Sequence, residues 1–238
     1  MSTKPILFNT DMVRAILAGR KTVTRRVVKP RFCDSVFEMF RGQLYEASPD
    51  KPPRNNGDGT TTRSVRAYVP CKAPYRPGDI LYVRETFGTY IGDYYLYRAD
   101  YPDGAKTYDY DGYKCNLPRW RPSIHMPREA ARIFLRVIDV RAERLQDSFF
   151  KHGNTIFYLQ REGIDIGEQC RECIDTYGSP ICNDSESECG ILDEVRGDFS
   201  DLWDSTLKPA DRALYGWAAN PWVWVIEFER VSREEANL

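Results

Sequence analysis

The feature that most constrains this chain is a helix end that passes directly into a basic strand. Apolar residues recur at helical spacing between Asn9 and Gly19, and glycine is the usual residue where a helix needs a left-handed C-terminal position. After a turn that carries Lys21, residues 22–28 are β-branched or basic and predict a strand. Side chains alternate along a strand. One face therefore carries Thr22, Thr24 and Arg26, and the other carries Val23, Arg25 and Val27.

Two later stretches are predicted to meet this turn. A Pro-Gly-Asp turn at residues 77–79 leads into a predicted strand that ends in Arg84 and Glu85. A short helix predicted over residues 154–162 ends at Glu162, directly before a glycine. We expect the three stretches to form one site.

Composition narrows the class of protein. The chain has 34 basic and 35 acidic residues, so its net charge of −1 excludes a uniformly basic surface but leaves room for a local basic patch. A hydrophobic content of 42% suits a globular core. There is no run of about 18 apolar residues and no signal-peptide pattern, and seven cysteines are an odd number. We therefore expect a cytoplasmic protein without a membrane segment.

Strand patterns dominate the rest of the chain. Strands are predicted over residues 5–8, 68–70, 80–85, 94–98, 132–140 and 222–231, and a further helix over residues 198–207. Long irregular connections separate the strands, which favours an α+β fold built as a small mixed β-barrel with peripheral helices. We expect a single domain over residues 1–238. Three polar segments are predicted to be loop insertions, at residues 41–66, 100–118 and 165–194.

Three pieces of the chain together resemble the ASCH domain family, whose fold is a β-barrel similar to the PUA domain. They are the Gly-Arg-Lys-Thr-Val-Thr-Arg run at residues 19–25, the Gly-Asp turn and strand at residues 78–83, and the final strand at residues 222–230. The Trp-Arg-Pro-Ser-Ile-His-Met-Pro-Arg run at residues 120–128 and the ending at residues 219–228 are similar to the larger, phage-encoded members. The resemblance covers most of the chain outside the three insertions.

The resemblance implies a protein directed at RNA, nucleosides or nucleotides. A small bacterial member of the family is an amidohydrolase that removes the acetyl group from N4-acetylcytidine with a Lys, a Thr and a Glu, and other members are ribonucleases or RNA binders. That lysine and threonine correspond here to Lys21 and Thr24, and the glutamate corresponds best to Glu162. The resemblance favours an amidohydrolase over a ribonuclease, and no organic cofactor is expected.

These residue types suit an amide hydrolase. Thr24 can act as the nucleophile, and Lys21 can take its proton if burial or neighbouring arginines lower the lysine pKa. Glu162 can then orient the lysine or shuttle the proton, and Arg84 or a backbone N–H can stabilise the oxyanion. The alternative is purely structural, with an exposed lysine at a helix end and an ordinary strand threonine.

A second interpretation is binding of RNA or a modified base without catalysis. Basic residues around Arg25 and Arg26 can contact phosphates, while Trp120 stacks on a base. Further residues predicted at this surface are Arg84, Glu85, His125 and Arg128. The alternative is that these arginines pair with the equally numerous acidic residues and that the histidine is structural. A third hypothesis is a phage accessory factor that binds another protein through its insertions.

Four cysteines gather late in the chain, and they are Cys170, Cys173, Cys182 and Cys189. Four thiolates can hold one structural Zn²⁺ tetrahedrally, and the first pair has the two-residue spacing of a zinc knuckle. Such a site would stabilise a polar segment that has few apolar residues of its own. Free reduced cysteines, or one redox pair, are the alternatives.

Overall fold

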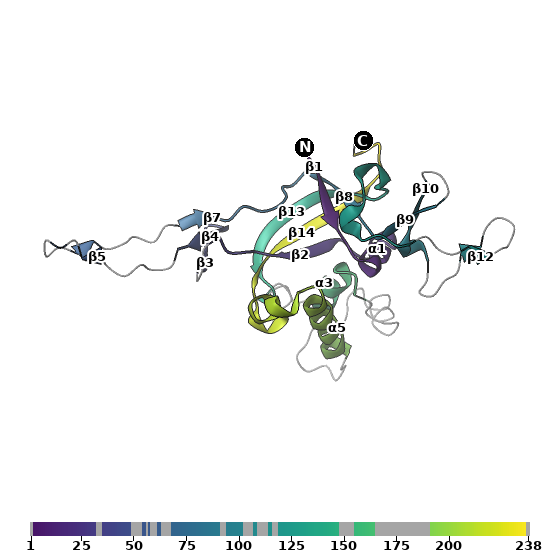
Figure 1. Ribbon diagram of the computed structural model, residues 1–238. Coiled ribbons are helices and arrows are strands. Elements are labelled where there is room, and N and C mark those ends of the chain that lie inside the picture. Colours follow the sequence, from purple (N-terminus) through teal and green to yellow (C-terminus); the bar gives the residue numbers. More distant parts are fainter. Residues whose placement is uncertain are drawn as a thin grey trace.

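The computed structural model describes residues 2–31, 35–48, 54–55, 57, 61–62, 68–90, 94–101, 107–108, 114–115, 119–147, 155–164 and 191–236. Its centre is a five-stranded mixed sheet with the strand order β1-β8-β13-β14-β2 (Figure 1). These strands are β1 (Thr3–Leu7), β2 (Val23–Val27), β8 (Ile80–Arg84), β13 (Phe134–Arg144) and β14 (Trp222–Val231). Strands β1 and β8 are parallel, and the other neighbouring pairs of this sheet are antiparallel.

The long strands β13 and β14 form the middle of the sheet. They pair along their lengths, with one bulge between Val137 and Asp139. The apolar start of β14 is buried on both faces, because Val225 and Ile226 point to opposite sides and are both fully covered. The strand predicted over residues 222–231 is confirmed.

Helix α1 (Thr10–Leu17) covers one face of the sheet. Its Val13 and Ile16 join one apolar cluster with Leu135 of β13 and Ile226 of β14. The apolar spacing of this short helix thus provides the side chains that bury its face against the strands. The helix predicted between Asn9 and Gly19 is confirmed.

The opposite face of the sheet is covered by α3 (Thr155–Arg161) and α5 (Ile191–Ser205). Leu159 of α3 and Trp203 of α5 pack with Val225 in a second apolar cluster. The helix predicted over residues 154–162 is confirmed, and the helix predicted over residues 198–207 begins earlier. Strand β2 lies at the sheet edge, and side chains from both clusters flank it.

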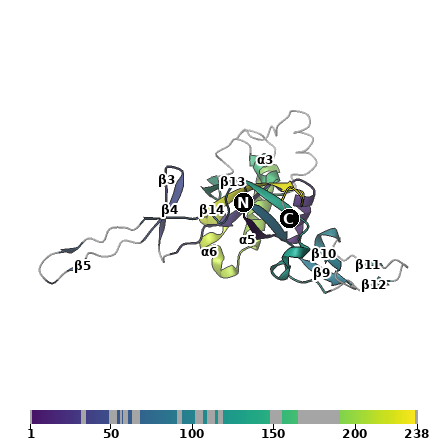
Figure 2. The same cartoon turned by 90° about the horizontal axis from the view of Figure 1, so that it is seen from above.

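The remaining elements are short. Three antiparallel pairs are formed by β9 (Phe87–Tyr90) with β10 (Tyr94–Tyr97), β5 (Arg54–Asn55) with β6 (Thr61–Thr62), and β11 (Thr107–Tyr108) with β12 (Lys114–Cys115). Helix α6 spans Arg212–Tyr215. The described residues also include five 3₁₀ turns, at Arg98–Asp100, Ser123–His125, Arg128–Ala130, Pro209–Asp211 and Trp217–Ala219. Seen from above, β5 and the β11–β12 pair lie at opposite ends of the molecule (Figure 2). Within the described part of the chain, no helix is long and apolar enough to cross a membrane.

The central sheet is open, which corrects the prediction of a closed barrel. In the strand order of the described residues, β1 and β2 are the two edges, and no closed barrel is found there. Strand spacing in a sequence does not distinguish a closed sheet from an open one, because both need the same alternation of side chains. The broader prediction, a mixed α+β protein with few helices, is confirmed.

A second correction concerns residues 41–66, which were expected to be a loop. Within them β4 (Gln43–Ala47) pairs with β3 (Val36–Phe40) and β7 (Tyr68–Pro70). We call these three strands the arm sheet. Leu44 of β4 is buried in the same apolar cluster as α1, which explains why the strand forms despite its polar surroundings.

Candidate active site at the start of strand β2

Helix α1 and its caps bring Lys21 into the interior. The side chain of Asn9 accepts a hydrogen bond from the backbone N–H of Met12 at 2.9 Å and caps the helix start. Gly19 has a φ of 73° and ends the helix, as predicted. The backbone N–H of Lys21 then donates to the carbonyl of Ala15 at 3.1 Å. This tight turn leaves Lys21 only 2% exposed.

A glycine also determines where Glu162 lies. Gly163 has a φ of 92°, and a Cβ at this position would lie 2.9 Å from the Cβ of Ala15. Only glycine therefore lets α3 end so close to α1. The backbone N–H of Thr22 donates to the carbonyl of Arg161 at 2.9 Å, which ties the end of α3 to the start of β2. The predicted meeting of these two stretches is confirmed.

Glu162 lies between two buried cations. Lys21 Nζ donates to Glu162 Oε2 at 2.9 Å and to the Glu162 carbonyl at 2.7 Å. Arg25 Nη1 donates to the other carboxylate oxygen, Oε1. The side chains of Lys21 and Arg25 are 1% exposed and that of Glu162 is 5% exposed. Two buried cations thus bond to one carboxylate, and buried charged groups of this kind are costly and are typical of functional sites.

This environment changes the acidity of Lys21. Burial lowers the pKa of Lys21 below its ordinary value of 10.5, because the charged ammonium loses its water. The Glu162 carboxylate opposes that change, whereas Arg26 and Arg25 add to it. The lowered pKa makes the neutral amine, which is the form a general base needs, more accessible than in an exposed lysine.

Thr24 lies close to this cluster but is not bonded to it. Its register partner across the sheet is Ile226, so its side chain leaves β2 on the face opposite Arg25, as the strand alternation predicted. Among the described residues, no hydrogen bond joins Thr24 Oγ1 to Lys21 or Glu162. Thr24 and Glu162 do share the lining of one small cavity of about 30 Å³.

Two larger cavities flank the small one, and all three are lined by Arg26 and Thr206. We call this set the Arg26 groove. The cavity on one side measures about 530 Å³ and is lined in part by Lys29, Lys72, Tyr75, Trp203 and Trp224. The cavity on the other side measures about 420 Å³, and Arg26 is the one charged residue among the described residues that line it, which include Phe8, Asn9, Met12 and Ser123.

Arg26 is held across this groove by two contacts. Its Nη2 donates to the carbonyl of Leu7 at 2.8 Å, and its guanidinium lies 5.4 Å from the ring centre of Phe8. Both partners come from the end of β1. The guanidinium is therefore fixed beside the cavities, where it can meet an anionic or aromatic group.

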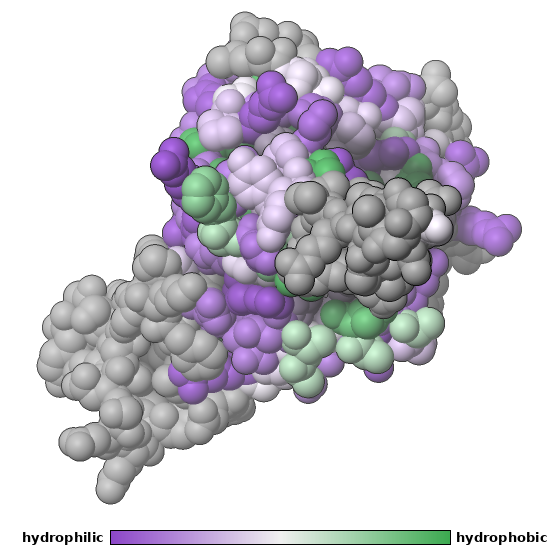
Figure 3. All heavy atoms as spheres, turned by 90° about the vertical axis from the view of Figure 1, so that its left-hand side faces the viewer, coloured by the Kyte–Doolittle hydropathy of each residue, from purple (hydrophilic) through white to green (hydrophobic). Residues whose placement is uncertain are grey.

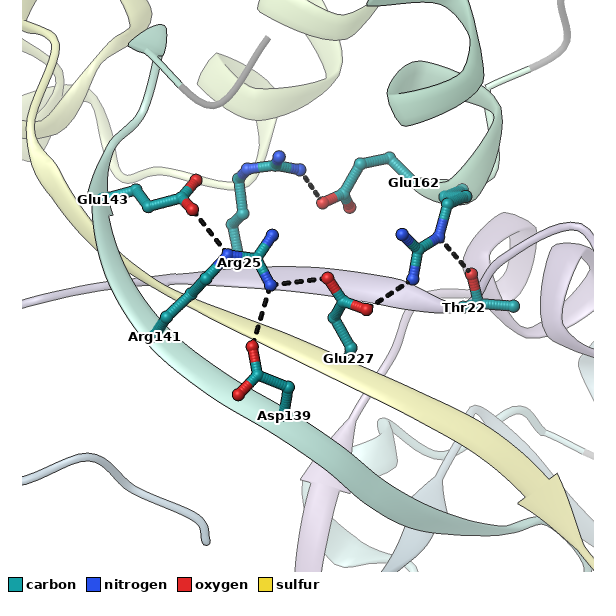
Figure 4. A network of polar contacts seen from close by, with 8 residues as sticks. Thr22, Arg25, Asp139, Arg141, Glu143, Glu162 and Glu227 are labelled. Carbon is teal, nitrogen blue, oxygen red and sulfur yellow. Dashed lines mark hydrogen bonds and ion pairs between the residues drawn. The ribbon is translucent and has the colours of Figure 1, made fainter. Parts of the chain in front are cut away.

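A second set of ion pairs is centred on Glu227 and reaches the helix that ends next to Glu162 (Figure 4). Glu227 of β14 accepts hydrogen bonds from Arg141 of β13 at 2.5 Å and from Arg161 of α3 at 2.7 Å. Arg161 Nε donates to Thr22 Oγ1 at 3.1 Å. Arg141 also bonds to the carboxylates of Asp139 and Glu143. The network joins the central strands β13 and β14 to Arg161, the last residue of α3.

The structure places Arg84 and Glu85 in other contacts. Arg84 donates to the carbonyls of Met126 and Ile124, and Glu85 forms two hydrogen bonds with Arg132, at 2.9 and 3.0 Å. Burial raises the pKa of Glu85, although Arg132 opposes the change. These contacts hold the segment that follows β8 and do not include Lys21 or Thr24.

Three further predicted binding residues lie outside the linings of the three cavities. Trp120 packs against Tyr101 with a ring distance of 5.8 Å, and the guanidinium of Arg128 lies 5.9 Å from the ring centre of Tyr82. His125 is exposed on a 3₁₀ turn. Their segment reaches the groove only through its neighbours Pro122 and Ser123. Base stacking by Trp120 stays a prediction.

The zinc prediction falls outside the described residues. All four cysteines concerned, Cys170, Cys173, Cys182 and Cys189, belong to residues 165–190. Among the described residues, no group of three or more His, Cys, Asp or Glu side chains could hold a metal ion. The proposed structural zinc therefore stays a prediction.

Some groove residues had no signal in the sequence. Lys72 and Tyr75 follow the arm sheet, and Trp203 and Trp224 read as core residues in a helix and a strand. Helical spacing and strand alternation predict which side chains are buried but not which of them line a cavity. Lys29 directly follows the predicted basic strand, so its place beside Arg26 is the one that chain position suggests.

Comparison with protein-family models, characterised proteins and solved structures gave no match to this chain.

Proposed function

We propose that this chain is an ASCH-type protein that hydrolyses the amide of an N4-acylated cytidine, with Lys21, Thr24 and Glu162 as its reacting residues. The observation that carries the proposal is the buried ion pair of Lys21 and Glu162, joined at 2.9 Å. A threonine hydroxyl and the same carboxylate line one cavity beside it. The sequence resemblance places the Lys, the Thr and the Glu of the family's deacylase at these same three positions.

The chemistry follows from the protonation state of the lysine. Lys21, whose pKa burial lowers, takes the proton of Thr24 in its neutral form as the threonine oxygen attacks the acyl carbon. The C–N bond then breaks, and the proton passes to the exocyclic nitrogen of cytosine, which leaves as an amine. Water hydrolyses the threonine ester and releases the carboxylic acid, so one water is consumed for each acyl group removed.

In this scheme Glu162 holds Lys21 in place, and substrate binding must bring Lys21 and Thr24 together. Thr24 Oγ1 makes no hydrogen bond to Lys21 among the described residues, so a small closure on substrate binding is required. Catalytic hydrogen bonds often tighten only in the bound complex. Helix α5 supplies Phe199, Leu202 and Trp203 to the small cavity that Thr24 and Glu162 share, so its shift would change the space around them.

The Arg26 groove suits a nucleoside in chemistry and size. Trp224 and Tyr75 offer ring surfaces for a base, and Lys29 and Lys72 offer charge for a phosphate on the same side. The adjoining cavity of about 530 Å³ falls in the usual range for small-molecule sites. These features support a nucleoside or nucleotide substrate.

The decisive experiment is to incubate purified protein with N4-acetylcytidine and follow cytidine by mass spectrometry. The full chain should release cytidine and acetate. Lys21→Met and Thr24→Val should each lower the rate by at least a hundredfold, because each removes a reacting group. The matched controls are Lys208→Met and Thr89→Val, whose parent residues are exposed on other elements. No turnover by the unmodified chain, or equal turnover in Lys21→Met, would overturn the proposal.

A second candidate function is binding of RNA or a modified base without catalysis. The observation that favours it is the burial of Lys21. Its side chain is 1% exposed and lines none of the three cavities, so a bound ligand would not reach it directly. Arg26, Lys29 and Lys72 remain at the groove and can contact phosphates whether or not the lysine reacts.

Salt dependence separates this candidate from the first. Binding of a short labelled single-stranded RNA should weaken as salt rises, because each phosphate contact releases counterions. Lys72→Ala should reduce the slope of log affinity against log salt by about 1, and the exposed Lys208→Ala should leave it unchanged. RNA affinity in a chain without turnover would favour the binding function over the hydrolase. An affinity that does not vary with salt would exclude it.

A further inference from the structure

The cavity of about 530 Å³ in the Arg26 groove lies where the arm sheet joins the central sheet. Lys29 belongs to the segment that leads from β2 to the arm sheet, and Lys72 belongs to the segment that leads from the arm sheet back to β8. Both lysines line this cavity together with Arg26. On the side from which the arm sheet projects, hydrophilic residues cover most of the described surface (Figure 3). A site for a charged ligand is expected on such a polar surface.

The three basic side chains make this cavity suitable for an anion. Like charges around one space raise the free energy of the site, and an anion between them reverses that cost. Arg26 is held in place, because its Nη2 donates to the carbonyl of Leu7 at 2.8 Å. A planar guanidinium binds two phosphate oxygens at once, and a lysine ammonium adds a point charge that can follow the ligand. The lining is therefore complementary to a phosphate group.

Fixed ring surfaces lie beside these charges in the same cavity. Trp203 Nε1 donates to the carbonyl of Tyr215 at 2.8 Å. The hydroxyl of Tyr75 donates to the carbonyl of Pro5 at 2.9 Å. Both rings line the cavity, as does that of Trp224. Rings that are already held by hydrogen bonds lose little freedom when a base stacks on them, so the cavity can take a base as well as a phosphate.

The arrangement of the cavities along β2 gives a ligand a direction. Thr24 and Glu162 line the small cavity, which shares four lining residues with the large one, namely Arg25, Arg26, Trp203 and Thr206. Lys29 lies five residues after Thr24, and an extended chain of that length spans about 17 Å. A cytidine nucleotide carries its exocyclic nitrogen at one end and its 5′-phosphate at the other. An extended lysine side chain and a nucleotide together can cover this span, with the exocyclic nitrogen towards Thr24.

Other ligands suit the three basic groups less well. A free nucleoside would bring no anion to Arg26, Lys29 and Lys72. An internal phosphate of a single-stranded RNA is a diester and carries a single negative charge. A phosphate monoester carries a charge of about −1.5 to −2 at pH 7 and therefore matches three cations better.

We propose that the Arg26 groove binds a nucleoside 5′-monophosphate, whose phosphate is held by Arg26, Lys29 and Lys72 in the cavity of about 530 Å³. This inference deepens the proposed function, on which it rests for the choice of cytosine as the base. The substrate class is then an N4-acylated cytidine 5′-monophosphate, and hydrolysis with one water yields cytidine 5′-monophosphate and the carboxylic acid.

The experiment compares cytidine 5′-monophosphate with cytidine. Each labelled ligand is equilibrated with the full chain by dialysis at pH 7 and constant ionic strength, and bound ligand is counted. The monophosphate should bind at least tenfold more tightly than cytidine, because it adds charge-assisted contacts to three cations. Equal binding of the two ligands would overturn the proposal, and so would binding of neither.

Variants test whether the phosphate lies in this cavity. Lys29 and Lys72 are exposed, so their replacement should leave the fold intact. Lys29→Ala and Lys72→Ala should each weaken binding of the monophosphate at least fivefold more than binding of cytidine. The matched control is Arg233→Ala, which removes an exposed positive charge near the C-terminus. An equal effect in the control, or no effect in either lysine variant, would overturn the proposal.

The result of this test is independent of turnover, because the ligand is the product of the proposed reaction. A chain that prefers the monophosphate but hydrolyses neither N4-acetylcytidine nor its 5′-monophosphate keeps the phosphate site and loses the hydrolase. A chain that hydrolyses N4-acetylcytidine and binds the two ligands equally keeps the hydrolase and loses the phosphate site. An oligocytidylate without a terminal phosphate that binds more tightly than the monophosphate would identify single-stranded RNA as the ligand and overturn the proposal.

Discussion

Lys21 and Glu162 are 141 positions apart in the chain, yet their side chains meet in the interior with Nζ and Oε2 2.9 Å apart. The second carboxylate oxygen binds Arg25. One carboxylate thus bonds to two cations that water does not reach. Two glycines make this contact possible, because Gly19 turns the chain into β2 and Gly163 ends α3 against α1.

The first prediction concerns the charge of Glu162. Glu162→Gln keeps the shape of the side chain but leaves Lys21 and Arg25 buried without an anion between them. We expect the free energy of unfolding at pH 7 to fall by about 3–5 kcal/mol, which is the usual cost of breaking a buried pair. Urea denaturation measures this loss.

Two further variants control this prediction. Glu129→Gln removes an exposed carboxylate and should change the stability by less than about 0.5 kcal/mol. Lys21→Met in the Glu162→Gln background removes one of the unneutralised cations and should restore part of the loss. A loss no larger than that of Glu129→Gln would show that Glu162 is not needed to balance the buried charge.

The local part of this site could be read from the sequence, and the long-range part could not. A glycine after apolar residues at helical spacing predicted the ends of α1 and α3, because capping depends on a few neighbouring residues. Strand alternation predicted that Thr24 and Arg25 point to opposite faces. It did not predict that Arg25 would bind Glu162, since alternation gives a face and not a partner.

The arm sheet and the Arg26 groove show a related limit of prediction from sequence. Strand β4 lies among glycines, prolines and charged residues, and Leu44 is its residue in the main core cluster. Because one buried side chain gives no periodic signal, residues 41–66 were read as a loop. The Arg26 groove was not predicted either, because Lys72 and Trp203 come to Arg26 from distant parts of the chain.

The second prediction follows from the lowered pKa of Lys21. In the unfolded chain a lysine titrates at its ordinary value of 10.5, whereas burial lowers the pKa in the folded protein. Between these two values the unfolded state binds a proton that the folded state lacks, so stability rises with pH across that window. Below the folded pKa both states are protonated and this dependence vanishes.

Lys21→Met provides the reference for that measurement, because it removes the titrating group and keeps an unbranched side chain. The free energy of unfolding of the unmodified chain, minus that of Lys21→Met, should increase as pH rises from 7 towards 10. A difference that decreases over this range would mean that Glu162 raises the lysine pKa more than burial lowers it.

The third prediction concerns Glu227, which bridges Arg141 and Arg161. Glu227→Gln should lower the free energy of unfolding by about 1–3 kcal/mol, because two charge-assisted hydrogen bonds lose their anion. A double-mutant cycle with Arg161→Met should give a coupling energy of at least about 0.5 kcal/mol. Purely additive effects would show that Glu227 does not hold the end of α3.

Glu229→Gln is the matched control for Glu227→Gln. Glu229 pairs with Arg136 at 2.8 Å on the same two strands, but their side chains are 50% and 33% exposed. Water screens this pair, so its loss should cost less than about 1 kcal/mol. Equal losses in the two variants would remove any special role for the network in Figure 4.

The fourth prediction concerns Asp79, at the turn before β8. Burial opposes its ionisation, but hydrogen bonds from Lys4 Nζ (2.7 Å), Ser2 Oγ (2.7 Å) and the backbone N–H of Arg76 (3.0 Å) outweigh it and lower the pKa from 3.8 to about 2. This fall corresponds to about 2 kcal/mol of stability, present above pH 3.8 and lost as the pH falls towards 2.

Asp79→Asn tests this directly, because it removes the titration while keeping the shape of the side chain. The unmodified chain should be more stable than Asp79→Asn by about 2 kcal/mol at pH 6, and the difference should shrink as the pH is lowered through 3.8. Because the turn ties β8 to the start of β1, the loss should appear as a lower urea midpoint with an unchanged slope. A difference that stays constant from pH 6 to pH 3 would mean that the carboxylate is not preferentially ionised in the folded protein.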